Sequence, residues 1–322
     1  MKEILHFYYK AIGLSKHLLL LLLLVSQNTL AADKTSSLNG VISTVGSDTL
    51  SRLISQWSEA FQQQHPQILL ELHTGGSSSA ATALISGTTL LAPMSRRMSS
   101  QESRQFQANH GYNVTEVPLA EDRIAVFVHP DNPLSHLTLT QLDAIFSSTR
   151  LRGHPTALSH WNQLQDSAAW SNRHIAVFSR SVTSGTYGDF RELALAGGDF
   201  INRLIELPGS IAVVRGVAAT ENAIGYASVA YRDPSIKLLS LQVQTSSPLS
   251  HPLDTLTDYP LARTLYLYIN QPPDTPLPAH YHAWLRFIFS AEGQAILQAS
   301  GLRPLPVNQY ETQLQIFEAA AS

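Results

Sequence analysis

The chain has 322 residues, of which 44% are hydrophobic and 14% charged, and its formal net charge is −3 at pH 7. This composition excludes a disordered chain, a collagen-like chain and a polytopic membrane protein, because apolar residues are abundant but not continuous. The slightly acidic balance gives no reason to expect nucleic-acid binding. The sequence contains 0 cysteines, which excludes disulfides, cysteine-type zinc sites, cysteine nucleophiles and a lipid-modified cysteine.

The N-terminal segment has the pattern of an export signal. Lysines precede an unbroken apolar run from Leu18 to Val25, and small residues follow it. A run of this length is too short to span a bilayer, which takes about 20 apolar residues. The pattern predicts a cleavable signal peptide over residues 1–31, cut after Ala31 or Ala32, with an uncleaved signal anchor as the alternative. Export without disulfides favours a bacterial periplasm, and release from the cell stays open.

From Gly40 onward, short apolar strands alternate with amphipathic helices. In chain order the sequence predicts a strand over 41–45, a helix over 51–64, a strand over 68–73, helices over 80–86 and 101–110, a strand over 124–129, a turn over 130–133, a helix over 140–146, a strand over 175–179, helices over 186–196 and 211–219, a strand over 263–270 and a closing helix over 278–299. Gly87 and Gly111 are the expected stops of the second and third helices. The repeated alternation predicts an α/β fold with largely parallel sheets.

Three of these helices begin in segments rich in glycine and hydroxyl residues, at 46–49, 75–79 and 184–186. A helix N-terminus presents free backbone N–H groups and the positive end of the helix dipole, so it is suited to bind an anion. Ser, Thr and Asp at such places also serve as ordinary helix caps, which is the alternative interpretation for each segment taken alone. The three segments together with Arg96 and Arg180 favour one shared oxyanion pocket.

Several segments resemble the periplasmic phosphate-binding proteins of ABC transporters, and they occur in that family's order. These are VGSDTL (45–50), GGSSSA (75–80), Ser95-Arg96, IAVFVHPDNPL (124–134), LTLTQLDAIF (137–146), RSVTSGTY (180–187), NAIGYAS (222–228) and AEGQAILQASGLRPL (291–305). The resemblance covers essentially the whole chain after the predicted signal peptide. Its most specific part is the Arg-x-x-x-Ser-Gly-Thr motif that starts at Arg180.

The resemblance implies a two-lobed α/β protein of the class II periplasmic-binding-protein fold, with a ligand cleft between lobes that close by a hinge. Lobe 1 would comprise residues 38–119 plus 238–318, and lobe 2 residues 120–237. The implied function is the periplasmic capture of inorganic phosphate for an ABC importer, without enzymatic activity and without a cofactor. The expected partners are phosphate or a similar oxyanion and the permease of an ABC transporter, with no nucleic acid, and the chain is expected to be a monomer.

Carried over by motif, the resemblance also implies the ligand-binding residues. These are Ser47, Asp48, Thr49, the amide of Leu50, Ser77, Ser78, Ser95, Arg96, Arg180, Ser184, Gly185 and Thr186. Some phosphate-binding proteins carry an aspartate in the third loop that accepts a proton from the ligand and so rejects sulfate. Here that loop, residues 92–97, contains no carboxylate. Asp48 is the candidate replacement, and a plain role in capping the helix is the alternative.

Other chemistries find little support in the sequence. The 13 histidines are scattered without an HExxH motif, so no metal site is expected. Neither a G-x-S-x-G elbow nor a P-loop lysine motif is present, which argues against hydrolase and nucleotide-binding roles. Two alternatives to phosphate transport stay open. One is the binding of another tetrahedral oxyanion, such as sulfate, arsenate or molybdate, and the other is a sensor, adhesion or regulatory role on the same fold.

Overall fold

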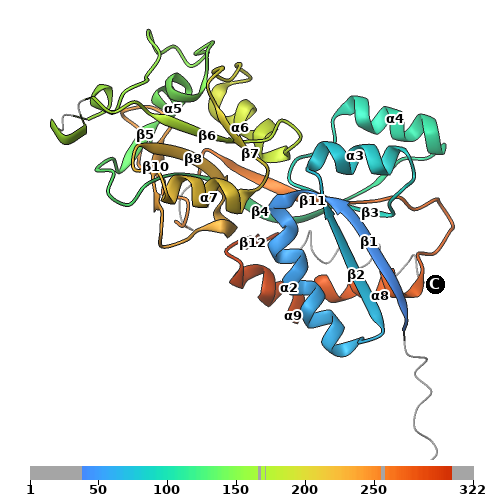
Figure 1. Ribbon diagram of the computed structural model, residues 1–322. Helices are drawn as coiled ribbons and strands as arrows, with labels where there is room; N and C mark the ends of the chain where they lie inside the picture. Colours follow the sequence, from blue (N-terminus) through green and yellow to red (C-terminus); the bar gives the residue numbers. More distant parts are fainter. Residues whose placement is uncertain (1–37, 166–167, 171, 255–257, 307–322) are drawn as a thin grey trace, which may run out of the picture. The chain divides into compact units, whose positions relative to one another are not determined.

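The computed structural model of the chain describes residues 38–165, 168–170, 172–254 and 258–306 (Figure 1). The predicted signal peptide, residues 1–31, and the end of the predicted lobe 1, residues 307–318, lie outside these ranges. The chain divides into two units, Met1–Asn39 and Gly40–Ser322, and the fold described below is that of the second unit.

The elements follow one another in the alternation that the sequence predicts. The strands are β1 (Gly40–Gly46), β2 (Ile68–Thr74), β3 (Leu91–Met94), β4 (Thr115–Val128), β5 (His136–Thr138), β6 (Ala176–Arg180), β7 (Ile205–Leu207), β8 (Ala223–Ser228), β9 (Lys237–Leu238), β10 (Ser240–Gln242), β11 (Ala262–Ile269) and β12 (Arg303–Pro304). The helices are α2 (Asp48–Gln64), α3 (Ser77–Ile85), α4 (Ser100–His110), α5 (Leu139–Phe146), α6 (Gly185–Leu195), α7 (Ser210–Ala218), α8 (Ala279–Ile288) and α9 (Ala291–Ala299), with short 3₁₀ turns at Trp161–Gln163, Ala168–Trp170 and Val229–Tyr231.

The strands form a mixed sheet in the order β2-β1-β3-β11-β4-β8-β6-β7, while β5 and β10 pair separately. Pairs at the two ends are parallel, whereas β3, β11, β4 and β8 run antiparallel to their neighbours in the middle. The expectation of largely parallel sheets therefore describes only the ends. The expectation is wrong for the middle of the sheet. There, β4 takes the chain from one group of strands to the other and β11 brings it back, so the two strands run antiparallel.

Strand β4 belongs to both groups. Residues 115–123 pair with β11, and residues 124–128 pair with β8. We call the strands on the β11 side, with α2, α3, α4, α8 and α9, the first half, and those on the β8 side, with α5, α6 and α7, the second half. The sequence predicted a strand only from Ile124, because Pro118 and several acidic residues interrupt the apolar pattern before it. Pairing with β11 makes that earlier segment a strand.

Local capping explains where the helices begin and end. Helix α2 starts three residues earlier than predicted because the Ser47 hydroxyl accepts a hydrogen bond from the Thr49 amide, at 3.3 Å. The predicted stop at Gly111 is confirmed, since this residue has the left-handed φ of 80° that glycine adopts without strain. The single closing helix was wrong, because Ser290 caps a new helix by accepting from the Gly293 amide and so separates α8 from α9.

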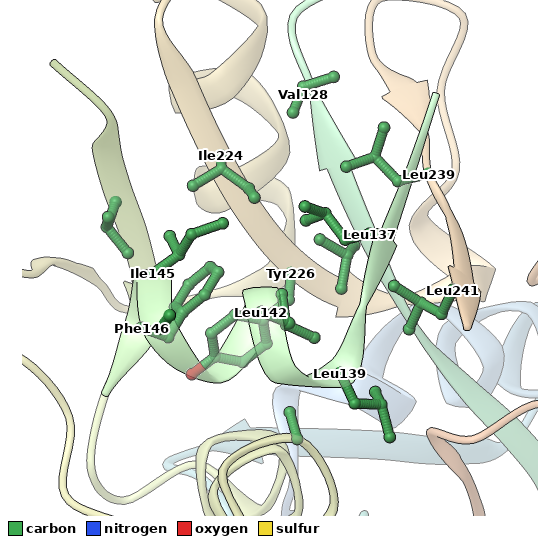
Figure 2. Close-up of a cluster of buried hydrophobic side chains, with 14 of the residues drawn as sticks. Val128, Leu137, Leu139, Leu142, Ile145, Phe146, Ile224, Tyr226, Leu239 and Leu241 are labelled. Carbon is green, nitrogen blue, oxygen red and sulfur yellow. The ribbon is translucent and has the colours of Figure 1, made fainter. Parts of the chain in front are cut away.

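Each half has its own apolar core. In the second half, the core includes Val128, Leu142, Phe146 and Tyr226, and Figure 2 shows α5 contributing Leu142, Ile145 and Phe146 to it. Part of the chain that the sequence places in lobe 1, residues 238–254 and 258–261, contributes to this same core. The contributing residues are Leu239, Leu241, Tyr259 and Leu261.

In the first half, helices cover both faces of the strands. Helices α3 and α4 pack together against β3 around the fully buried Phe106. Helices α2, α8 and α9 pack together as well, with the rings of Trp57 and Trp284 edge to face at 6.4 Å. The Trp57 indole N–H donates to the Gly293 carbonyl at 2.7 Å, so the burial of this large side chain leaves its polar atom satisfied.

Candidate oxyanion site

Three helix starts from the two halves meet at one place. Helices α2 and α3 start just after the ends of β1 and β2 in the first half, and α6 starts after β6 in the second. Ser47 and Ser184 act as the N-caps of α2 and α6, accepting from the Thr49 and Thr186 amides. Gly76 caps α3 without any side chain, so no capping side chain occupies the first amides of that helix. The capping interpretation is thus correct for the two serines, and it does not exclude a shared site.

Hydroxyl groups from the first half form a buried cluster at these helix starts. The Ser47 hydroxyl donates to the Ser95 hydroxyl at 2.9 Å, and the hydroxyls of Ser77 and Ser95 lie 3.3 Å apart. The Ser95 amide in turn donates to the Ser77 hydroxyl at 3.1 Å. All three side chains are fully buried. Hydroxyl hydrogens rotate freely, so this cluster can redirect its donors toward an anion.

Gly185 brings the start of α6 against this cluster. A Cβ atom at this position would lie 2.4 Å from the Ser77 Oγ and 2.6 Å from the Ser95 Oγ. These distances are far inside van der Waals contact, so only glycine permits the two halves to approach here. The Ser78 amide also donates to the Thr183 carbonyl at 3.2 Å, which adds a direct contact between the halves.

Substitution Gly185→Ala is expected to weaken the binding of phosphate, the anion that the resemblance implies, at least about tenfold, because the new methyl group pushes the helix start away from the cluster. Gly188→Ala provides the matched control in the same helix, since a Cβ there would meet only the Arg96 Cδ, at 3.8 Å. Isothermal titration calorimetry of both variants gives the comparison. Equal affinities for the two variants would contradict the role assigned to Gly185.

Two threonines connect the halves directly. The hydroxyls of Thr49 and Thr186 lie 2.8 Å apart, and both residues are buried. Thr186 also accepts a hydrogen bond from Nη2 of Arg263, at 2.9 Å. The Thr186 oxygen accepts from Arg263 through one of its lone pairs. The hydroxyl hydrogen of Thr186 is therefore directed away from Arg263, toward Thr49 or a ligand. Charged donors polarise such chains and strengthen the donors further along.

Arg180 is the most deeply buried charge among the predicted site residues. Its side chain is 1% exposed, with Nη2 3.0 Å from Oδ2 of Asp48 and Nη1 donating to the Ser210 hydroxyl at 2.6 Å. Its Nε has no hydrogen-bond partner among the described residues. Burial lowers the pKa of the guanidinium, while Asp48 acts to raise it, and arginine stays charged at neutral pH. A buried charged donor of this kind is costly unless an acceptor reaches it, which is what an oxyanion supplies.

Only one carboxylate oxygen of Asp48 interacts with other described residues. Its Oδ2 accepts from Arg180 and, at 2.8 Å, from the Ser210 amide at the start of α7. Its Oδ1 forms no hydrogen bond or ion pair with the residues that the structure describes. The aspartate therefore holds the arginine in place and still has an acceptor oxygen available.

Arg96 is held by a carboxylate outside the predicted set. Both terminal nitrogens of Arg96 donate to Glu102, at 2.8 and 2.7 Å, and Nη2 also donates to the Ser78 hydroxyl at 3.3 Å. Burial acts to raise the pKa of Glu102, but the hydrogen bonds from Arg96 and Ser99 outweigh it and lower this pKa. The third loop, which lacks an acid of its own, thus has one supplied by α4.

Not every predicted donor is available. The Leu50 amide donates to the Ser47 carbonyl at 3.1 Å within the first turn of α2, and the Ser78 amide is engaged by Thr183. The side chains of Ser47, Thr49, Ser77, Ser95, Arg180, Ser184 and Thr186 are brought together at the helix starts. Arg96 and Ser78 lie beside them, joined to each other.

Sequence reasoning missed a buried ionic network next to Thr186. Nε and Nη2 of Arg263 lie 3.0 and 2.8 Å from Oδ2 of Asp122, and Nη1 lies 3.1 Å from Oδ2 of Asp189. Asp122 is fully buried, and the Ser228 hydroxyl donates to its other oxygen at 2.6 Å. Burial raises the pKa of Asp189, against the opposing effect of Arg263. The available sequence signal was a charged residue inside or beside an apolar strand pattern.

Two further searches covered the described part of the chain only. Among those residues, no cluster of three or more His, Cys, Asp or Glu side chains has the arrangement of a metal site. Within the same ranges, every helix is too short or too polar to cross a bilayer.

Comparison with known proteins gives consistent relatives. The profile of the PBP superfamily domain matches residues 30–292. The phosphate-binding protein PstS of Pseudomonas aeruginosa is 39% identical over 281 residues, which is 86% of this chain and 87% of that protein. Protein SphX of Synechococcus elongatus is 23% identical over 92% of this chain and 86% of its own length.

Solved structures agree on the fold. A protein from Clostridium perfringens, described as a phosphate ABC transporter substrate-binding protein and solved with bound phosphate, superposes with a TM-score of 0.69 at 25% identity, over 83% of this chain and 100% of that one. An ABC-type phosphate transport receptor from Vibrio cholerae gives a TM-score of 0.61 at 21% identity, over 83% of this chain and 100% of that one. The expected α/β fold of two lobes is thereby confirmed.

Proposed function

Because this chain belongs to the PBP superfamily and, within it, to the family of the PstS phosphate-binding proteins, we propose that it captures inorganic phosphate for an ABC importer. The observation that carries the proposal is the buried guanidinium of Arg180. Its Nε has no partner among the described residues, and its Nη2 contacts Asp48 at the start of α2, where helix N-termini from both halves converge. An anion binding there would satisfy a buried positive charge, and charge-assisted hydrogen bonds are the strong ones.

The proposed ligand-binding set has two kinds of member. Hydroxyl and amide donors come from Ser47, Thr49, Ser77, Ser95, Ser184, Gly185 and Thr186, and Arg180 supplies the charged donor. Asp48 orients Arg180, and Glu102 holds Arg96 beside the site with Ser78. Leu50 contributes through the helix turn that it closes rather than as a free donor.

The proposed lobes follow the two cores. We assign residues 40–123 and 262–306 to the first lobe and residues 124–261 to the second. The return point proposed from the sequence, near residue 237, is moved to about residue 261, because Leu239, Leu241, Tyr259 and Leu261 pack into the core of the second half. Strands β4 and β11 would then be the two connections about which the lobes close.

A role in import requires that the protein meet its ligand outside the cytoplasm. The leader-like pattern of residues 1–31 supports export to the periplasm. The partner would be the permease of an ABC transporter, with the chain acting as a monomer that binds and releases phosphate without chemical turnover. A phosphatase would hydrolyse p-nitrophenyl phosphate, whereas this protein is expected to leave that compound unchanged, and turnover would contradict a pure binding role.

The first experiment is calorimetric titration of mature, phosphate-stripped protein with phosphate and then with sulfate. Stripping is needed because a tightly bound ligand co-purifies and hides its own site. Micromolar or tighter binding of phosphate in preference to sulfate supports the proposal. Equal binding of sulfate would make the chain a general oxyanion-binding protein, and no binding of either anion would refute phosphate capture.

Asp48 is proposed as the residue that distinguishes protonated phosphate from sulfate. Its Oδ1 is an acceptor, so it favours an anion that carries a proton at neutral pH and repels fully ionised sulfate. Asp48→Asn is expected to narrow the ratio of phosphate to sulfate affinity about tenfold or more, since a carboxylate acceptor for the ligand proton is lost. Titration of both anions measures the ratio.

The matched control is Asp199→Asn, because Asp199 also pairs with an arginine but is 71% exposed. An unchanged ratio in the Asp48 variant would assign this aspartate to the positioning of Arg180 alone.

A further inference from the structure

A cavity of about 550 Å³ adjoins the candidate oxyanion site. It lies against Asp48, Arg180 and Ser184, and it extends along the face of α7 formed by Ile211, Ala212 and Arg215. The hydroxyl cluster and the two threonines described above are not part of its lining. Its volume falls within the range of sites that hold whole small molecules, about 300–1,000 Å³, and far exceeds what a single tetrahedral anion needs.

The cavity lies between the two halves, because residues 74–76 of the first half and residues 208–209 and 211–212 of the second contribute to its lining. The halves already touch at the oxyanion site, through the pair Thr49–Thr186 and through the Ser78 amide on the Thr183 carbonyl. On the other side of Asp48, the hydroxyl of Tyr231 donates to the Asp48 carbonyl at 2.7 Å. The space therefore lies between parts of the two halves that are in contact.

The charges on the cavity wall favour an anionic occupant. The charged residues of the lining are Asp48, Arg180 and Arg215, so its net charge is positive. Arg215 is exposed, and its side chain makes no hydrogen bond or ion pair with the residues that the structure describes. It is thus a guanidinium available for a ligand.

Backbone donors point to the same class of occupant. Helix α7 begins after Gly209, which caps it without a side chain, and Ile211 and Ala212 in its first turn line the cavity. Amides in the first turn of a helix lack partners within the helix. The lining therefore holds backbone donors for anionic oxygen beside the side chain of Arg180.

We propose that this protein also binds phosphoryl compounds that carry a second anionic group, with the phosphoryl group in the oxyanion site and the second group in the cavity near Arg215. This inference rests on the proposed function, because it uses the same oxyanion site for the first group. Pyrophosphate is the simplest ligand of this class, and methyl phosphate is its counterpart with a small uncharged substituent.

The test is calorimetric titration of stripped protein with phosphate, pyrophosphate and methyl phosphate, with phosphorus NMR to verify that bound pyrophosphate is intact. Pyrophosphate is expected to bind, and Arg215→Gln is expected to weaken it about tenfold, as the loss of one charge-assisted contact implies. The same variant is expected to change phosphate and methyl phosphate affinity less than twofold. Arg203→Gln is the matched control, since Arg203 is also exposed in the second half but does not line the cavity.

A second variant tests the space instead of the charge. Ala212→Phe is expected to fill the cavity and abolish pyrophosphate binding while phosphate binding persists. Phosphate binding without pyrophosphate binding in the unmodified protein would overturn this inference and leave the proposed function intact. Equal loss of pyrophosphate in the Arg215 and Arg203 variants would also overturn it. Failure to bind phosphate at all would overturn the proposed function instead.

Discussion

Replacement of Arg180 by methionine is expected to weaken phosphate binding about 100-fold, since a hydrogen bond to a charged group contributes about 1.5–3 kcal/mol and each 1.4 kcal/mol is about tenfold in affinity. Arg180 is 1% exposed and offers a donor, Nε, that the described residues leave without a partner. Methionine fills a similar volume but donates nothing. The variant also leaves Asp48 without its counter-ion beside the anion, which adds repulsion to the loss of attraction.

Two comparisons make the Arg180 result specific. Arg180→Lys keeps the charge but loses Nε and the planar pair of terminal nitrogens, so its affinity is expected to lie between those of the methionine variant and the unmodified protein. Arg191→Met removes another arginine of the second half, which pairs with Asp199 at the surface, and is expected to change affinity less than twofold. Calorimetry with phosphate measures all three variants. If Arg180→Met bound phosphate within threefold of the unmodified protein, Arg180 would not be a ligand contact.

Replacement of Arg263 by methionine is expected to lower the free energy of unfolding by about 3–5 kcal/mol, the usual cost of leaving a buried charge without its partner. Asp122 is fully buried, and two nitrogens of Arg263 reach its Oδ2. Without the arginine, Asp122 retains only the Ser228 hydroxyl among the contacts described here. Urea denaturation of the phosphate-stripped protein measures the change without a contribution from ligand.

If the unpaired charge of Asp122 causes the loss of stability, removing that charge is expected to restore part of the free energy of unfolding. Asp122→Asn combined with Arg263→Met removes the unpaired charge, so this protein is expected to be more stable than Arg263→Met alone. Arg303→Met is the control, because Arg303 pairs with Glu121 on the same strand β4 where both side chains are about two-fifths exposed, at 41% and 38%. Its expected effect is below about 1 kcal/mol. Equal destabilisation by the Arg263 and Arg303 variants would contradict the proposed importance of burial.

Local sequence information predicted most of the helices and strands. It failed where pairing between distant segments determines whether a segment becomes a strand. The helix starts after Gly46 and Gly76 and the stop at Gly111 follow from residue types within a few positions. The first part of β4 does not, because its acidic residues and Pro118 have no strand pattern until β11 lies beside them. The break between α8 and α9 was readable in principle, since Ser290 precedes Glu292 and Gly293 as a helix cap, but the apolar periodicity obscured it.

In the candidate site, too, the features marked by neighbouring residues were predicted, and the contacts between distant residues were not. The three helix starts were found because glycine and hydroxyl residues mark them in the sequence, and the structure brings them together. Glu102 was not predicted, and Asp48 was predicted as a site residue but not as the partner of Arg180. Glu102 lies six residues beyond Arg96, and Asp48 is 132 positions before Arg180, so no local pattern connects either acid to its arginine. Arg263 was assigned to a strand and given no role, although it reaches Thr186 across 77 positions of sequence.

The pairing of β4 with β11 contains one irregularity, and it bears on how the two halves move. The register shifts between Leu265 and Tyr266, and Tyr266 faces Pro118, which has no N–H to donate. The two connecting strands are joined by a hydrogen-bonded ladder everywhere else along their overlap, so they resist sliding past each other. If the two halves close on a ligand, the bulge is the place where this ladder offers least resistance to bending. The same Tyr266 also pairs with Met94, the residue before Ser95, so the bulge lies directly beside the third loop of the candidate site.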